Sequence, residues 1–236
     1  MKPVRSSSVV LAMASLLFLT GCGSLLGGGK RDTLFRFGAI QPAPSLPQPE
    51  QRTARQHLSL GRINLPPEAD GDRILTTRGQ TMLYLKDARW VATVPELMTQ
   101  LLGRQFALRA PHIDLARTRG VGRGGSRLEI DVDRFEARYE MDDPDIAPVV
   151  RISGTATIMH RCVDQPDTKH FNVEVPASAN SKSAIAAAFD SGAEQFARQL
   201  VDWTIVTAPR EMDLAAGNCR EAHRPWRARA AMDRRL

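Results

Sequence analysis

The stretch SAIAAAFDSGAEQFARQLVDWTIV (residues 183–206) has the clearest amphipathic pattern in the chain. Its large apolar side chains recur at the spacing that places them on one face of an α-helix: Ile185, Phe189, Phe196, Leu200 and Trp203. A membrane-surface helix concentrates Lys and Arg on its polar face, whereas this one mixes acidic and basic residues: Asp190, Glu194, Arg198 and Asp202. We therefore predict a helix that packs its apolar face on a sheet.

The sheet is expected to centre on residues 126–140, where apolar and acidic side chains alternate. Alternation of this kind is typical of a strand with one buried and one wet face. Residues 149–161 and 171–175 are predicted to continue from it as an antiparallel meander. Further predicted elements are strands at 33–40, 58–65, 74–77 and 81–90, and a helix that begins at Pro95. These elements predict an α/β (α+β) fold in which an antiparallel sheet is packed by two main helices.

The first 22 residues have the features of a bacterial lipoprotein signal. Lys2 and Arg5 precede an uncharged run that ends at Thr20 and is shorter than the roughly 20 residues needed to cross a bilayer. The following residues complete a cut site, Leu19-Thr20-Gly21-Cys22, that resembles the lipobox of bacterial prolipoproteins. We predict that Cys22 carries the diacylglycerol and acyl groups of such proteins. The alternative is an ordinary secretory signal with a chance cysteine.

This assignment divides the chain into four parts. Residues 1–21 form the cleaved signal, 22–32 a flexible lipidated tether, 33–207 a single domain and 208–236 an Arg-rich tail. The residue after the cysteine is Gly23. It is not the Asp that would resemble an inner-membrane retention signal. We therefore expect the anchor in the inner leaflet of the outer membrane, with the body facing the periplasm. We expect no cofactor besides this covalent lipid.

Charge and cysteine content limit the partners further. The net charge is +6, including Lys2 and Arg5, and it is too diffuse to indicate a nucleic-acid partner. Apart from Cys22 the chain has Cys162 and Cys219, and an oxidising periplasm favours their pairing. A bridge across this separation would stabilise the fold by about 4 kcal/mol on the chain-entropy model. Free buried thiols or an intermolecular bridge are the alternatives.

The sequence contains fragments of enzymatic motifs, but their surroundings in the sequence do not fit an enzyme site. The glycines of GVGRGG (120–125) precede a predicted strand, whereas a dinucleotide site needs them before a helix. The acidic residues of the central strand, Glu129, Asp131 and Asp133, are explained by its wet face. The histidines show no metal-binding spacing and are interpreted as surface residues, although a site assembled in space stays possible: His57, His112, His160, His170 and His223. We predict a protein that is not an enzyme and has no catalytic or metal site.

A set of residues spread between positions 65 and 95 resembles the ABC-type transport auxiliary lipoprotein family: Leu65-Pro66, Asp72-Arg73, Thr77-Arg78, Tyr84, Arg89-Trp90 and Pro95 before a Leu-rich helix. The resemblance extends over about residues 32–206. Two departures are clear. The family usually has a tyrosine-rich first strand where this chain reads Leu34-Phe35-Arg36-Phe37, and the tail after Pro209 is not part of its pattern.

The resemblance implies a non-enzymatic subunit of an ABC permease and ATPase system, often one with a mammalian-cell-entry (MCE) domain protein. Such systems are thought to move phospholipids or other hydrophobic molecules between membranes. Assembly of several copies of this chain stays open. The rival interpretation is an envelope scaffold or outer-membrane assembly lipoprotein without a transporter role. We expect partner docking near Tyr84, Arg89 and Trp90, because aromatic residues and arginine are favoured at interfaces; for Trp90 a plain core position is the alternative.

Overall fold

The computed structural model describes residues 31–38, 56–117, 126–140, 146–160 and 165–208. Cys22, Cys162 and Cys219 lie outside these ranges, as do the signal, residues 22–30 of the tether and residues 209–236 of the tail. The described chain forms eight strands and two helices: β1 (Thr33–Phe35), β2 (Gln56–Asn64), β3 (Arg73–Arg78), β4 (Thr81–Trp90), α2 (Val94–Arg109), β5 (Ile113–Arg117), β6 (Ser126–Tyr139), β7 (Val149–Met159), β8 (Asp167–Pro176) and α3 (Lys182–Thr207).

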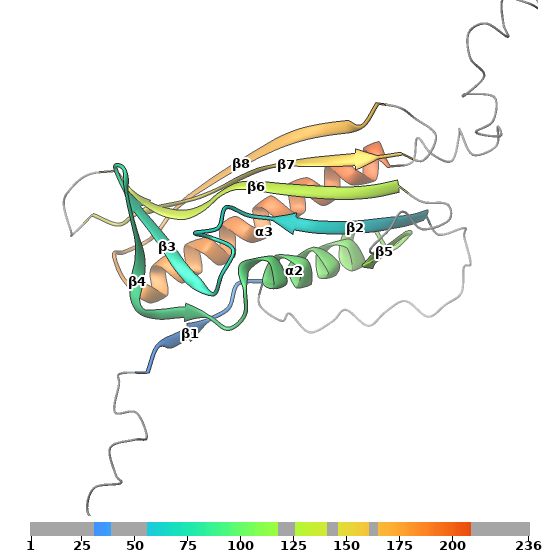
Figure 1. Cartoon of the computed structure of the whole chain (residues 1–236). Helices are drawn as coiled ribbons and strands as arrows, with labels where there is room; N and C mark the ends of the chain where they lie inside the picture. Colours follow the sequence, from blue (N-terminus) through green and yellow to red (C-terminus); the bar gives the residue numbers. More distant parts are fainter. Residues whose placement is uncertain (1–30, 39–55, 118–125, 141–145, 161–164, 209–236) are drawn as a thin grey trace, which may run out of the picture. The chain divides into compact units, whose positions relative to one another are not determined.

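All eight strands join in one sheet, and β6 is its central strand (Figure 1). On one side β6 pairs antiparallel with β7, which pairs antiparallel with β8. On its other side β2 runs parallel to the first half of β6, and β3 runs parallel to its last residues. Then β5 pairs with β2, and β4 and β1 follow β3. The α/β class with two packed helices is confirmed, and the sheet is mixed rather than antiparallel throughout.

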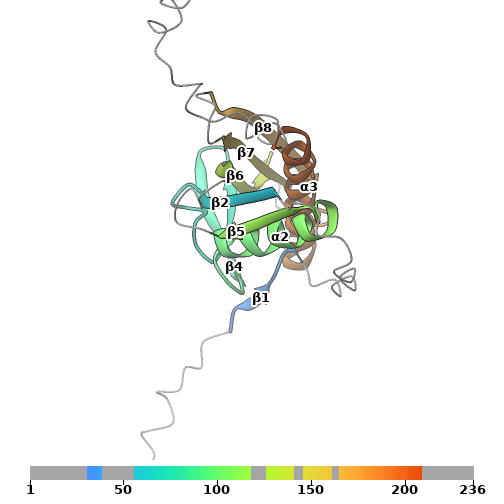
Figure 2. The same ribbon diagram turned by 90° about the vertical axis from the view of Figure 1, so that its right-hand side faces the viewer.

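Both helices cover the same face of the sheet (Figures 1 and 2). Helix α3 packs on β7 and β8, while α2 packs on α3, β2 and β5. Four residues of the face predicted to be buried are fully buried, Ile185, Phe189, Phe196 and Leu200, whereas Trp203 is only partly buried. On the sheet, alternate apolar residues of β6 and β7 are fully buried: Leu128, Ile130, Ile152, Ala156 and Ile158. Hydrophobic burial between these layers holds the fold together.

A bulge in β6 interrupts the alternation of inward and outward residues. The register with β7 shifts between Val132 and Arg134, so that Phe135 becomes the next inward residue. The neighbouring position on β7 is Gly154, where a Cβ atom would lie 2.6 Å from the carbonyl oxygen of Asp131. Only glycine allows the two backbones to approach so closely at the bulge.

The residues after β1 fasten that short strand to both helices. Gly38 has φ +65°, a conformation that favours glycine. Its N–H donates to Asp190 Oδ1 on α3 at 2.6 Å, and Arg104 on α2 donates to its carbonyl oxygen. Burial lowers the pKa of Arg104, as does the nearby charge of Arg36, while Asp190 opposes the shift. The predicted strand 33–40 therefore ends at Phe35, because the chain turns between the helices.

Candidate functional site

Trp90, one of the three residues predicted to dock a partner, is a core residue. Its side chain is only 2% exposed and lies among three phenylalanines. The ring centroid of Trp90 is 5.1 Å from that of Phe37 and 5.3 Å from that of Phe189, both edge-on, and 6.4 Å from that of Phe135. Edge-to-face packing of this kind stabilises an aromatic core. Trp90 is therefore removed from the predicted docking surface, and the alternative left open by the sequence holds.

Tyr84 and Arg89 stay partly exposed, but both hold the connection between β2 and β3. The Tyr84 hydroxyl donates to the carbonyl oxygen of Glu68 at 3.2 Å, and the Arg73 guanidinium lies 4.3 Å from the centre of its ring. Arg89 Nη1 lies 3.1 Å from Asp72 Oδ2. We call residues 65–72 the connecting loop. Tyr84 and Arg89 both hold this loop in position.

Backbone hydrogen bonds fix the same loop to the strand and helix that follow. The N–H of Trp90 donates to the Asp72 carbonyl oxygen at 2.7 Å, and that of Val94 donates to Gly71 at 3.1 Å. Within the loop, the N–H of Ala69 donates to Pro66 at 2.8 Å. Most motif residues between positions 65 and 95 therefore come together in space as one structural unit, whereas Thr77 and Arg78 lie at the far end of β3 and pair with β6.

This unit forms one wall of a groove of about 950 Å³. The floor is β2 at the bulge between Leu60 and Ile63, beyond the point where pairing with β5 ends. The lining residues come from β2, the connecting loop, the start of α2 and β6: Leu60, Gly61, Arg62, Ile63, Asp70, Thr93, Pro95, Glu96, Thr99 and Arg127. The volume is at the upper end of the range typical of ligand pockets, although this groove is open to solvent.

The groove presents charges of both signs above an apolar floor. Arg62 and Arg127 come from the sheet, and Asp70 and Glu96 from the loop and helix. Arg127 Nε also lies 2.8 Å from Glu129 Oε1. A surface of this composition suits a polypeptide segment with apolar and charged side chains better than a purely apolar ligand. Apart from the motif that builds its wall, the groove could not be predicted from the sequence, because β2 and α2 meet only in three dimensions.

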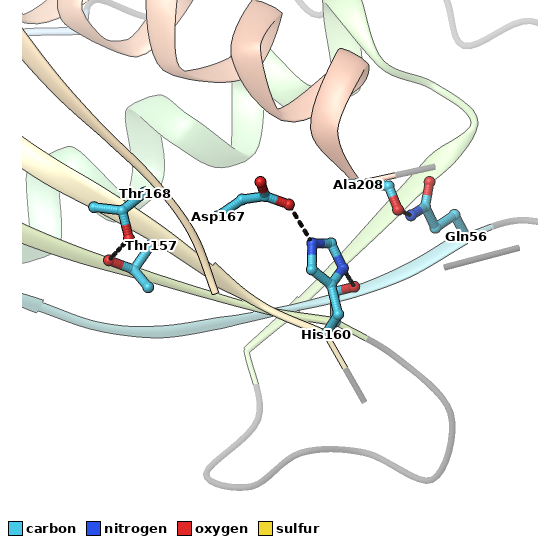
Figure 3. A network of polar contacts seen from close by, with 7 residues as sticks. Gln56, Thr157, His160, Asp167, Thr168 and Ala208 are labelled. Carbon is cyan, nitrogen blue, oxygen red and sulfur yellow. Dashed lines mark hydrogen bonds and ion pairs between the residues drawn. The ribbon is translucent and has the colours of Figure 1, made fainter. Parts of the chain in front are cut away.

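A buried polar cluster of Ser126, His160 and Asp167 lies at another part of the sheet (Figure 3). Ser126 Oγ is 3.1 Å from His160 Nδ1, and His160 Nε2 is 3.0 Å from Asp167 Oδ2. The interpretation of His160 as a surface residue is wrong, since its side chain is 2% exposed. The sequence could not show the cluster because its members lie at the ends of three different strands.

The polar cluster has the residue types of a hydrolase triad without the geometry. In such a triad the serine contacts Nε2 and the aspartate contacts Nδ1, and the serine must reach a substrate. Here both contacts are exchanged, and Ser126 is fully buried. The cluster joins the start of β6, the residue after β7 and the start of β8. Its chemistry suits fastening these strand ends.

The acidic residues of β6 do not form a paired carboxylate site. Glu129 contacts Arg127, Asp131 accepts from Asn64 at 2.7 Å, and Asp133 lies 3.7 Å from His170 Nδ1. Among the described residues no group of three or more His, Cys, Asp or Glu side chains is arranged to hold a metal ion. Neither α2 nor α3 is long and apolar enough to cross a membrane.

Comparisons with known proteins agree with this fold. Protein XCC0632 from Xanthomonas campestris, described as DUF330, superposes with a TM-score of 0.62 at 24% identity, covering 77% of this chain and 99% of its own. A second crystal structure, of an uncharacterized protein, gives a TM-score of 0.56 at 14% identity, covering 73% and 97%. No curated protein matches the chain.

Structural similarity at these identities shows the fold alone, whereas sequence comparison assigns the family. Residues 39–201 match the family described as ABC-type transport auxiliary lipoprotein component. This range contains the connecting loop, the groove and most of α3. The chain therefore belongs to the ABC-type transport auxiliary lipoprotein family, whose members are membrane-anchored in the periplasm and associate with an ABC transport system.

Proposed function

We propose that this protein is a non-enzymatic subunit that docks on a periplasmic component of an MCE-type transport system for phospholipids or other hydrophobic molecules. The observation that carries the proposal is the groove. The residues that resemble the family motif hold the connecting loop, and that loop and Pro95 line the groove. We infer that the groove built by these motif residues is the surface on which the transport partner docks.

The groove offers a partner segment three kinds of contact. Arg62 and Glu96 are exposed and Asp70 is half-buried, so charged side chains of both signs are accessible along its length. Pro95, which is partly exposed, supplies apolar area, while Leu60 and Ile63 close the floor and are almost fully buried. Among the described residues, the pairing of β2 with β5 ends at Leu60, so the next residues of β2 present an edge beside the groove that no described strand pairs with. An extended segment that pairs with such an edge gains affinity from the backbone and specificity from its side chains.

The docking experiment compares two charge reversals of the full acylated chain. Arg62→Glu changes the groove, and Arg198→Glu makes the same change of charge on the exposed surface of α3, which does not line it. We expect Arg62→Glu to reduce co-purification of the MCE-domain protein by about tenfold, the loss that corresponds to about 1.4 kcal/mol. Arg198→Glu should capture as much as wild type, and both variants should melt at the wild-type temperature.

Two results would contradict the proposal at different levels. Equal capture by Arg62→Glu and wild type, also after Thr99→Trp fills the groove, would remove the groove as the docking surface. Failure of the wild-type chain to capture any permease, ATPase or MCE-domain protein after crosslinking in cells would remove the transporter role itself. An envelope scaffold or assembly protein would then be the partner class to seek.

The proposed anchor is the acylated Cys22 in the inner leaflet of the outer membrane. Family membership supports a lipoprotein, and Leu19 to Cys22 supply the lipobox. One acyl chain binds a membrane only marginally, whereas several chains hold a protein there almost permanently. Cys22→Ala should therefore leave the fold intact and release the chain or leave its signal uncleaved, as fractionation and mass spectrometry would show. Unmodified Cys22 in normally membrane-bound mature protein would be incompatible with this anchor.

A further inference from the structure

Exposed apolar side chains gather on the two strands nearest the tether. Within the described ranges, eight large apolar side chains are exposed, and five of them lie on β1, on β4 or directly after β4: Leu34, Met82, Leu83, Tyr84 and Val91. Met82 and Leu83 are 57% and 61% exposed and stand next to each other. Consecutive strand residues point to opposite faces, so each face of this strand exposes a large apolar side chain, and such exposure indicates a contact surface.

The segment that carries Met82, Leu83 and Tyr84 contains charges of one sign only. Residues 78–86, which we call the hairpin arm, read RGQTMLYLK and contain Arg78 and Lys86 but no acidic residue. The first acidic residue after them, Asp87, is paired: Lys182 Nζ lies 3.7 Å from its carboxylate and donates to its carbonyl oxygen at 3.2 Å. A basic segment with apolar and aromatic residues at its centre has the composition of a surface that binds anionic lipid.

The body fixes the direction of the hairpin arm. The pairing of β4 with β3 jumps from Arg89 opposite Arg73 to Tyr84 opposite Leu75, so that residues 85–88 form a bend in β4. Asp87 at this bend has φ +51°, and the contact with Lys182 at the start of α3 holds it. The arm is therefore braced within the sheet, where β3 pairs with the end of β6, and Figure 1 shows its turn at the end of β4 away from β1.

The tether brings the membrane within reach of the arm. Cys22 is 11 residues before Thr33, a length of at most about 36–40 Å when extended. Thr33 pairs with Ala88, and Met82 is six residues before Ala88, which is about 20 Å along a strand. The distance from Met82 to the pair of Thr33 and Ala88 is thus shorter than the extended length of the segment between Cys22 and Thr33.

We propose that the hairpin arm contacts the surface of the membrane that holds the lipid anchor, with Met82 and Leu83 at the boundary between headgroups and acyl chains. Lys86, which is exposed, would then face anionic headgroups, while the half-buried Arg78 lies over the ring of Tyr139. The contact orients the body relative to the membrane and leaves the groove free for a protein partner. The inference rests on membrane anchoring and is independent of which transport protein docks.

The test uses the full acylated chain in vesicles of phosphatidylethanolamine and phosphatidylglycerol. A photoreactive p-benzoylphenylalanine replaces Leu83 in one sample and Val206 in another. Val206, near the end of α3, is 76% exposed, so exposure alone predicts more lipid adduct there than at position 83. We expect the opposite, with about tenfold more adduct at position 83, because an apolar side chain at the bilayer boundary meets lipid continuously.

Two further variants separate apolar contact from charge. Met82→Asp should lower the adduct yield at position 83 about tenfold, because a carboxylate is costly to place against acyl chains. Lys86→Glu should lower it only in vesicles that contain phosphatidylglycerol, and not when phosphatidylcholine replaces that lipid. Equal lipid adduct at positions 83 and 206, or crosslinks from position 83 in native envelopes that lead only to protein, would overturn the inference.

Discussion

The sheet differs sharply between the strand ends that the polar cluster joins and the hairpin arm. At the polar cluster, Ser126 is fully buried and His160 nearly so, and the histidine uses both ring nitrogens to join three strand ends. The hairpin arm instead exposes Met82 and Leu83 while fixed contacts brace its base. Buried polar groups thus satisfy one another in the first region, and apolar groups face solvent in the second.

The comparison teaches how to separate structural from functional residues in this protein. A Ser, His and Asp in contact look catalytic by residue type, yet burial and the exchanged nitrogens assign them to fastening strands. Consecutive exposed apolar residues on a strand look unremarkable in the sequence. They cost solubility, which is a reason to expect that they contact another surface.

The largest effect on stability is expected where the two layers meet, away from the hairpin arm. Phe196 is fully buried, and its ring centroid is 5.8 Å from that of Phe171. Phe196→Ala should lower the free energy of unfolding by about 3–5 kcal/mol, because the remaining side chains cannot fill the cavity. Leu83→Ala is the matched control and should change it by less than about 0.5 kcal/mol. Denaturant unfolding measures both, and similar losses would erase the distinction between these regions.

The predicted disulfide would reinforce the region of the polar cluster. Cys162 follows His160 by two residues, and Cys219 follows Ala208 by 11. Ala208 accepts a hydrogen bond from Gln56 Nε2 at 2.5 Å, and Gln56 is two residues before Leu58, which pairs with Ser126 of the cluster (Figure 3). The described residues from which both cysteine segments depart are therefore neighbours.

We expect an intramolecular bridge between Cys162 and Cys219 in the mature protein. Cys162→Ser should lower the free energy of unfolding by up to about 4 kcal/mol under oxidising conditions and have little effect under reducing ones. Mass spectrometry without reduction would detect the bridge directly. Labelling of both thiols in natively purified protein would show that they are free.

The elements whose pattern is local were predicted from the sequence closely. Helix α3 and strand β6 differ by one residue at each end or less from the ranges 183–206 and 126–140. Strand β5 was missed, since IDLAR is short and half polar. The parallel pairing of β2 and β3 with β6 was missed as well, because pairing across a sheet depends on contacts between distant residues that no single pattern specifies.

The candidate site was predictable only in part and for a related reason. Tyr84 and Arg89 support the connecting loop in the fold, a role that their residue types did not indicate, and docking through them stays a prediction. Trp90 has the same residue-type signal and is core. The sequence contains the residues of the groove and of the polar cluster, but their proximity arises from topology.

The polar cluster should contribute to stability without contributing chemistry. His160→Ala removes both of its contacts from a buried place and should lower the free energy of unfolding by about 1–3 kcal/mol. His170→Ala is the matched control. His170 is exposed, and its Nδ1 lies 3.7 Å from Asp133 Oδ2, so this substitution should lower the free energy of unfolding by less than about 0.5 kcal/mol. Thermal unfolding would compare them. An unchanged melting temperature for His160→Ala would show that the cluster does not fasten the strand ends.

The smallest expected effect concerns the loop that walls the groove, and it distinguishes support from direct docking. Arg89 and Asp72 form an ion pair whose side chains are 41% and 42% exposed, so Arg89→Ala should lower the free energy of unfolding by less than about 1 kcal/mol. If Arg89 only holds the loop, Arg89→Lys should restore most partner capture, because a lysine can still pair with Asp72. If Arg89 touches the partner through its planar guanidinium, lysine should not restore capture. Melting curves and co-purification of the MCE-domain protein, measured on both variants, decide between the two roles.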